Sequence, residues 1–165
     1  MGIGNLLLKD EGVGVHVVER LREIPLPENV EVLDGGTAGL DLVDFIEGYK
    51  KLIVIDAVNA GEKPGTLYRL TEENLDIKQK AIMSFHDIDF LDALYMSETM
   101  NQKPGEVVVI GIEPKDMSEG LELSPEIEER IPEIIKLVMK EVNHSKENSR
   151  GILPRTNDER VRQDA

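Results

Sequence analysis

The sequence predicts an α/β fold, a three-layer sandwich in which helices flank a mostly parallel, twisted sheet. Strand-like runs alternate with amphipathic helical runs along the chain, which is the pattern of a parallel sheet with helical crossovers. The apolar runs Leu52–Ile55 and Val107–Ile110 are continuous and β-branched, as is typical of strands buried on both faces. With 165 residues, 40% of them hydrophobic, the chain suits one domain with a substantial core.

The first half of the chain predicts two helices and three strands. The first helix follows Asp10, which is placed to cap its start, and ends before Pro25. The later segments are a short strand at 30–33, a helix at 40–48, a buried strand at 51–58 and an edge strand at 66–70.

The second half predicts two more helices around one further strand. A helix from Asp87 places Leu94 and Tyr95 on its apolar face, and a buried strand follows at 107–112. The last helix starts at Ser124-Pro125 and runs to about Val142, with Pro132 kinking or splitting it. We therefore expect a folded domain at 1–144 and a flexible tail at 145–165.

Composition excludes several classes of function. The chain has 33 Asp+Glu against 19 Lys+Arg, a net charge of −14, which argues against nucleic acids and anionic membranes as partners. It has no cysteine, so thiol nucleophiles, thiolate zinc sites and iron–sulfur clusters are excluded. No signal peptide or membrane-length apolar run is present, so the expected compartment is the cytoplasm.

Common enzyme motifs do not explain the sequence. Gly2-Ile3-Gly4 resembles the start of a dinucleotide fingerprint, but the third glycine position is Leu7 and no strand precedes the motif. A flavodoxin would need a hydroxyl-rich phosphate loop and stacking aromatics, and Trp is absent. Ser84 and His86 lie two residues apart, which does not make a nucleophile and its base.

Three chemistry-bearing side chains fall where an α/β sheet builds its sites. Glu11 stands at the start of the first helix, Asp56 ends the most apolar strand, and His86 precedes a later helix. Because sites form at the carboxyl ends of the strands, these segments can converge on one crevice. Two carboxylates and an imidazole suit nickel or zinc. The alternative is structural, with a turn cap, a helix-dipole partner and an ordinary loop histidine.

Six motifs in order resemble those of the nickel–iron hydrogenase maturation endopeptidases, over about residues 2–142. They are GIGNLLLKDEGVG at 2–14, DGGTAGL at 34–40, IDA at 55–57 followed by KPGT at 63–66, SFH at 84–86, GIEP at 111–114 and GLELSP at 120–125. One motif alone would be weak evidence, but six at fitting separations are specific.

The resemblance implies a cytoplasmic, monomeric endopeptidase. Such enzymes remove a C-terminal extension from the hydrogenase large-subunit precursor, their partner, after nickel has been inserted into it. Carried over motif by motif, the metal-contacting residues are Glu11, Asp56 and His86, and the nickel is mainly the substrate's own. The alternatives are a non-catalytic chaperone or nickel-binding protein for hydrogenase assembly, and a small-molecule hydrolase on a similar sheet.

The resemblance also suggests roles for two aspartates. Asp56 is expected to activate or polarise water or the scissile carbonyl, and Asp34 to support cleavage. Together they are the candidate catalytic residues, which leaves an aspartic-type peptidase open. A turn-capping role for Asp34, before Gly35-Gly36, is an equal alternative.

One departure from the family pattern concerns the first strand. Family members usually carry several apolar residues before the first Gly-x-Gly, and these form a central strand. Here Met1 directly precedes Gly2. The sheet is therefore expected to have its first strand cut short, which would leave apolar flanks of the neighbouring strands uncovered.

Overall fold

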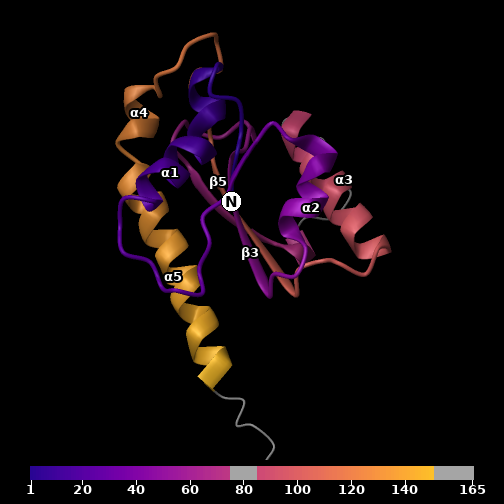
Figure 1. The fold of residues 1–165 in the computed structure, drawn as a ribbon. Helices are drawn as coiled ribbons and strands as arrows, with labels where there is room; N and C mark the ends of the chain where they lie inside the picture. The colour runs from indigo at the N-terminus through magenta and orange to yellow at the C-terminus, as the bar shows by residue number, and fades with distance from the viewer. Residues whose placement is uncertain (75–84, 151–165) are drawn as a thin grey trace, which may run out of the picture.

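The computed structural model describes residues 1–74 and 85–150, without the side chains of residues 74, 85–89 and 145–150. Its layers confirm the predicted sandwich (Figure 1). Helices α1 (Val13–Leu21) and α5 (Ile131–Arg150) cover one face of a central sheet. Helices α2 (Leu42–Ile46) and α3 (Phe85–Thr99) cover the other.

The described residues form a five-stranded sheet in the order β2-β1-β3-β5-β4. The strands are β1 (Gly2–Ile3), β2 (Asp34–Gly36), β3 (Lys51–Ala57), β4 (Leu67–Thr71) and β5 (Glu106–Ile112). All neighbouring pairs are parallel except β4 with β5, which is antiparallel. Strand β4 lies at one edge of the sheet. The mostly parallel sheet and the edge strand are both confirmed.

The core lies on both faces of β3 and β5, as their continuous apolar runs predict. Along β3, Leu52 and Val54 pack toward α2 and α3, whereas Ile55 and Ala57 pack toward α1 and α5. The strand therefore has no solvent-facing side along this stretch, because side chains alternate between the two covered faces.

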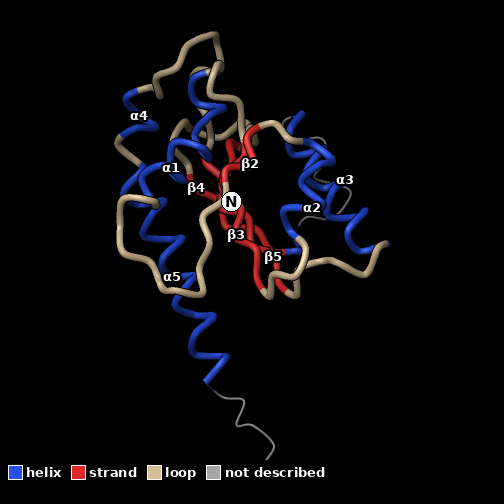
Figure 2. Tube along the Cα trace, viewed as in Figure 1, coloured by secondary structure: helices blue, strands red, loops and turns tan. Residues whose placement is uncertain are grey.

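Strand β1 lies in the middle of the sheet and has only two residues. Figure 2 marks the N-terminus among the strands. It pairs with β3 only through Gly2 and Ile55. The amino group of Met1 donates to the Ile53 carbonyl at 2.7 Å, and burial lowers the pKa of this amino group to about 5. A hollow of about 420 Å³ opens beside it, lined by β3 and by the apolar residues Val30 and Val32.

The short first strand explains an error in the predicted elements. The strand expected at 30–33 is wrong, and β2 instead occupies Asp34–Gly36. A segment forms a strand only where it pairs with a neighbouring strand. The first residue of β1 is Gly2, which pairs with Asp34, so the pairing with β2 starts at Asp34. The amide of Gly2 still bonds the Leu33 carbonyl at 3.0 Å, where the pairing begins.

The predicted division of the last helix near Pro132 is confirmed, but the end of the helix differs from the expectation. The last helix is divided into α4 (Pro125–Glu128) and α5, which places Pro132 at the second position of α5. A proline in the first turn of a helix removes no internal hydrogen bond, so α5 continues without a break. It runs to Arg150, beyond the expected end near Val142; residues 151–165 of the predicted tail lie outside the description.

One residue of α3 is placed wrongly by the periodicity. Leu94 is buried as expected, but Tyr95 is 73% exposed. The helix packs through Phe90, Ala93 and Leu94, and the next residue points about 100° away from Leu94 around the helix axis.

Within the described ranges, no helix is both long and apolar enough to cross a membrane.

A buried carboxylate attaches α5 to the sheet. Glu141 is 5% exposed and accepts hydrogen bonds from Lys51 of β3 at 3.0 Å and Arg69 of β4 at 2.6 Å. The hydrogen bond from Arg69 and the charge of Lys51 lower the pKa of Glu141 to about 2. Breaking this arrangement would leave a buried charge without its partners, so it fixes where α5 lies.

Candidate functional site

The glycines of the opening motif allow α1 to lie directly against the sheet. A Cβ at Gly14 would stand 2.2 Å from the Ile55 carbonyl oxygen, and one at Gly4 would stand 1.8 Å from the Glu11 carbonyl oxygen. These glycines therefore serve close backbone packing. The approach also brings the loop that carries Glu11 to the carboxyl end of β3.

Glu11 is held in the 3₁₀ turn η1 (Lys9–Gly12), which contacts β3. The residue is only 6% exposed. A carboxylate so far removed from water is costly to keep charged unless polar groups or a cation compensate it. Its burial at the carboxyl end of the central strand fits the predicted site.

Asp56 is the second-to-last residue of β3 and is 1% exposed. Its Oδ1 accepts a hydrogen bond from the Ala57 amide at 2.8 Å. Strand alternation places Asp56 on the same face as Val54, which is the face that α2 and α3 cover. The structure thus places Asp56 and Glu11 at the same end of the sheet, from two different elements.

His86 lies in the first turn of α3, and its side chain is outside the description, as is all of Ser84. Among the described side chains, no three His, Asp or Glu residues form a group that could hold a metal. The His86 imidazole is not among these side chains. The metal set of Glu11, Asp56 and His86 therefore stays a prediction.

Asp34 begins β2 and is exposed. Its Oδ1 accepts a hydrogen bond from the Gly36 amide at 3.0 Å, which is the turn-capping geometry that an Asp before two glycines favours. The Gly36 carbonyl in turn accepts from the Gly4 amide at 2.9 Å. Asp34 therefore shapes a turn that adjoins the opening loop, and its role in cleavage stays a prediction.

Asp10 is a buried residue whose importance the sequence pattern did not indicate. It does not cap the first helix: Gly12 is the N-cap residue of α1 and makes no side-chain capping bond. Asp10 is 0% exposed and instead accepts from the Lys115 and Asp116 amides and from both the amide and hydroxyl of Ser124, at 2.7–2.9 Å. These bonds join the opening loop to the loop that follows β5. Nothing local in the sequence points to partners so distant.

Glu113 is a second residue that the sequence reasoning missed. It follows β5 directly, is 3% exposed, and accepts from the Ala60 and Gly61 amides at 2.9 Å and from the Tyr68 hydroxyl at 2.6 Å. Burial, together with the hydrogen bond to Glu113, raises the pKa of Tyr68. Glu113 thereby fixes the loop that follows Asp56. The rule that singled out Asp56, a carboxylate at the end of a buried strand, would also have found it.

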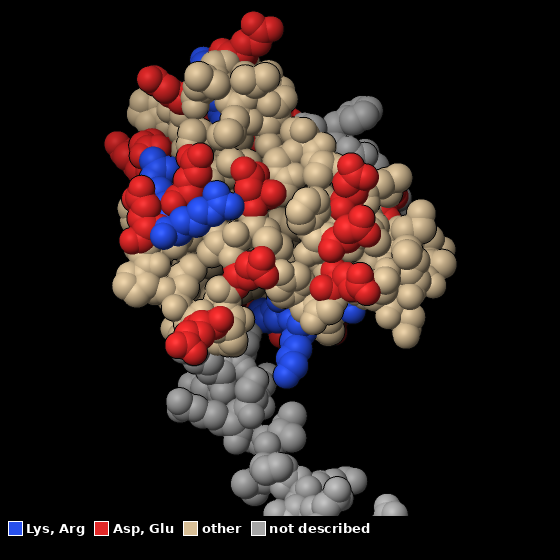
Figure 3. All heavy atoms as spheres, viewed as in Figure 1, with Lys and Arg blue, Asp and Glu red and all other residues tan. Residues whose placement is uncertain are grey.

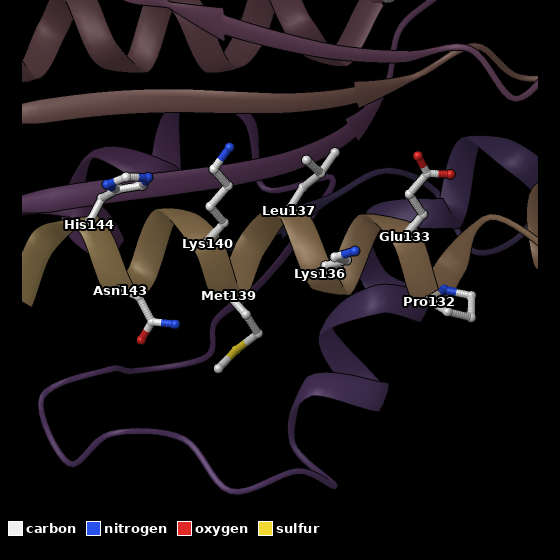
Figure 4. Close-up of a pocket in the computed structure, with 8 residues that line it drawn as sticks. All are labelled: Pro132, Glu133, Lys136, Leu137, Met139, Lys140, Asn143 and His144. Atoms are coloured by element: carbon white, nitrogen blue, oxygen red, sulfur yellow. The ribbon is translucent and has the colours of Figure 1, made fainter.

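On the face shown in Figure 3, acidic side chains outnumber basic ones. A separate hollow of about 820 Å³ lies along α5 (Figure 4), where Lys136, Leu137 and His144 are among the lining residues. Neither Glu11 nor Asp56 lines it. We place the candidate site at the carboxyl end of β3 because the buried carboxylates are there.

The fold and this site define an α/β protein with a mixed five-stranded sheet and buried carboxylates at the carboxyl end of its central strands. The chain belongs to the hydrogenase maturation protease family, whose model matches residues 15–141. Members bear the names of peptidases that act in hydrogenase maturation. The family that the six sequence motifs resemble is thus confirmed.

Curated relatives cover most of the chain. The hydrogenase expression/formation protein HupD of Rhodobacter capsulatus is 39% identical over 145 residues, which are 86% of this chain and 69% of that protein. The hydrogenase 2 maturation protease of Escherichia coli is 32% identical over 147 residues, 88% of this chain and 90% of that protein. The HupD of Thiocapsa roseopersicina is 38% identical, and the match spans 64% of its length.

Solved structures confirm the fold. The hydrogenase maturating endopeptidase HybD from Escherichia coli is 32% identical and superimposes with a TM-score of 0.78, over 87% of this chain and 90% of that chain. The maturation protease HybD from Thermococcus kodakarensis is 28% identical with a TM-score of 0.70, over 85% and 95% of the two chains.

Proposed function

We propose that this protein is an endopeptidase that removes the C-terminal extension of a nickel-loaded hydrogenase large-subunit precursor. The observation that carries the proposal is the pair of buried carboxylates, Glu11 and Asp56, at one end of the sheet in a member of the hydrogenase maturation protease family. Burying a carboxylate is costly, and the position of these two at the carboxyl end of β3, where α/β sheets form their sites, favours a functional reason for them.

The nickel of the precursor would serve as a recognition handle. Carboxylate and imidazole ligands suit a borderline metal ion with open coordination positions, and Glu11, Asp56 and His86 would supply them. Binding the metal would hold the nearby scissile peptide in a fixed position, which accounts for a large part of many enzymes' rate enhancement. Asp56 would act on the water or on the scissile carbonyl, and the turn that Asp34 caps would support the bound peptide.

The test is to mix the protein with a nickel-loaded large-subunit precursor and with the nickel-free precursor. Mass spectrometry should show a shortened product from the loaded precursor only. Cleavage of both at the same rate would exclude nickel as the handle. Binding of the loaded precursor without cleavage would instead support the non-catalytic assembly chaperone.

A further inference from the structure

Two exposed leucines stand on loops that are bonded to one another beside the candidate site. Leu7, in the opening loop, is 65% exposed, and Leu121, in the loop after β5, is 64% exposed. The Gly120 amide donates to the Leu7 carbonyl at 2.9 Å, and the Lys9 amide donates to the Gly120 carbonyl at 2.9 Å. Leu8 and Gly120 form a parallel bridge between the loops.

The paired loops are fixed in place. Asp10 accepts four hydrogen bonds from the loop after β5, at 2.7–2.9 Å, and Lys9 bonds Asp116 across the two loops at 2.6 Å. The His16 ring nitrogen lies 3.2 Å from the Leu121 carbonyl oxygen. Figure 1 shows the loop after β5 at the top of the molecule, over the segment that leads into α1. Leu7 and Leu121 are thus large apolar side chains held toward solvent by a rigid backbone, which lowers the entropic cost of binding a partner.

The charge around the leucines indicates what kind of partner fits. Glu119 and Glu122, which flank Gly120-Leu121, are both exposed. The lysines of the two loops are each engaged by an acid, Lys9 by Asp116 and Lys115 by Glu126. The exposed surface therefore combines apolar side chains with negative charge, which is complementary to a segment that carries apolar and basic side chains together.

We infer that Leu7 and Leu121, with Glu119 and Glu122, form a docking surface for the precursor's polypeptide, and that they bind a segment with apolar and basic side chains. This inference rests on the proposed function. The loop that holds Leu7 continues directly into Glu11, four residues on. A segment seated on the leucines would therefore lie next to the candidate site. The surface would supply affinity for the precursor without taking part in the chemical step.

The test compares Leu7→Ser, Leu121→Ser and the double variant with Tyr95→Ser, a matched control at an exposed position on α3. Binding and processing of the nickel-loaded precursor are measured, with unfolding midpoints as a check of folding. We expect each leucine variant to raise KM and Kd roughly tenfold, with kcat and the unfolding midpoint nearly unchanged and with no effect in Tyr95→Ser. A second pair, Glu119→Gln and Glu122→Gln, should weaken the salt dependence of binding.

The outcomes separate the two proposals. Wild-type cleavage with unchanged KM and Kd in the double leucine variant would refute the docking surface and leave the proposed function standing. An equal loss of affinity in Tyr95→Ser would also refute the docking surface, since the effect would then not be specific to these loops. A wild type that neither binds nor cleaves the loaded precursor would overturn both.

Discussion

Asp10 and Glu11 are neighbours in the sequence, and both carboxylates are buried, yet their surroundings differ. Asp10 accepts four hydrogen bonds from the loop after β5, and its carboxylate therefore holds the two loops together. Glu11 lies in the 3₁₀ turn η1, which contacts β3. The structure therefore separates a residue that positions the site from one that is a candidate to act in it.

Asp56→Asn is expected to abolish processing and to leave the fold intact. Asparagine has nearly the same shape and can still accept from the Ala57 amide, but it cannot serve as a charged ligand or base. We expect the rate of precursor cleavage to fall about 100-fold or more. Circular dichroism and the unfolding midpoint should match the wild type, and an unfolded variant would assign Asp56 a structural role.

Asp34→Asn distinguishes the two interpretations of Asp34. Asparagine caps the same kind of turn, so the bond to the Gly36 amide should be kept. If the charge of Asp34 supports cleavage, kcat should fall about tenfold or more while KM stays similar. Wild-type kinetics in this variant would leave turn capping as its role.

Asp10→Ala is expected to destabilise the protein strongly. It would leave three backbone amides and the Ser124 hydroxyl without their acceptor, in a position that is 0% exposed. We expect the free energy of unfolding to fall by about 2–4 kcal/mol, as measured by urea denaturation. Asp116→Ala, at the partly exposed end of the same loop pair, should lower the free energy of unfolding by clearly less. Equal losses would contradict the role we assign to Asp10.

Among the elements, β1 is the one whose length decides the most. Because it begins at Gly2, it covers only one residue of β3, leaves 30–33 outside the sheet, and buries the amino group of Met1. Burial of this amino group disfavours its charged form, which is why its pKa lies well below the usual 8.0. The hollow beside Met1 is lined by β3 on one side and by residues 30–33 on the other, which is where an extended β1 would lie.

An added N-terminal extension of about five apolar residues should therefore stabilise the fold. It would continue β1 alongside β3 and cover the apolar lining of the hollow. We expect the melting temperature to rise by about 5 °C or more, with higher solubility. An extension of the same length made of glycine and serine is the matched control, and an equal gain from both would contradict the strand interpretation.

The pH dependence of stability gives a second readout for the same element. Between pH 5, near the folded pKa of the Met1 amino group, and pH 8.0, its ordinary value, the unfolded chain binds more protons than the folded one. Stability contributed by this group therefore rises with pH across that window. The apolar extension removes the buried amino group, so the rise should become smaller in the extended protein.

At the scale of the whole molecule, the excess of acidic residues is the main long-range feature. The net charge is −14, and acidic side chains predominate on the viewed face (Figure 3). Such a field favours encounter with a basic surface and is screened by salt. It bears on how fast a partner is found and not on which fold forms.

Processing should accordingly weaken as salt is added. Between about 50 and 500 mM NaCl we expect kcat/KM for the loaded precursor to fall several-fold, mainly through slower association. Unfolding midpoints over the same salt range control for effects on the enzyme's own stability. A rate that is constant or rises with salt would argue against a basic surface on the precursor.

The sequence by itself determined the features that depend on neighbouring residues. The runs at Leu52–Ile55 and Val107–Ile110 specify strands buried on both faces, because continuous β-branched residues fit a doubly covered sheet. Ser124-Pro125 marks the start of α4, and Pro25 lies four residues beyond the last residue of α1. Polar residues at the carboxyl ends of strands and at the starts of the following helices indicate the end of the sheet where a site forms, which makes Asp56 and Glu11 candidate site residues.

Only the tertiary structure decided the features that depend on distant partners. It shifted β2 from 30–33 to Asp34–Gly36, because pairing is available only where β1 lies alongside. It turned Asp10 from a helix cap into the link to Ser124, more than a hundred residues away. It exposed Leu7 and Leu121, whose apolar character alone would place them inside. Burial and hydrogen-bond partners are properties of the folded arrangement, and a local pattern does not contain them.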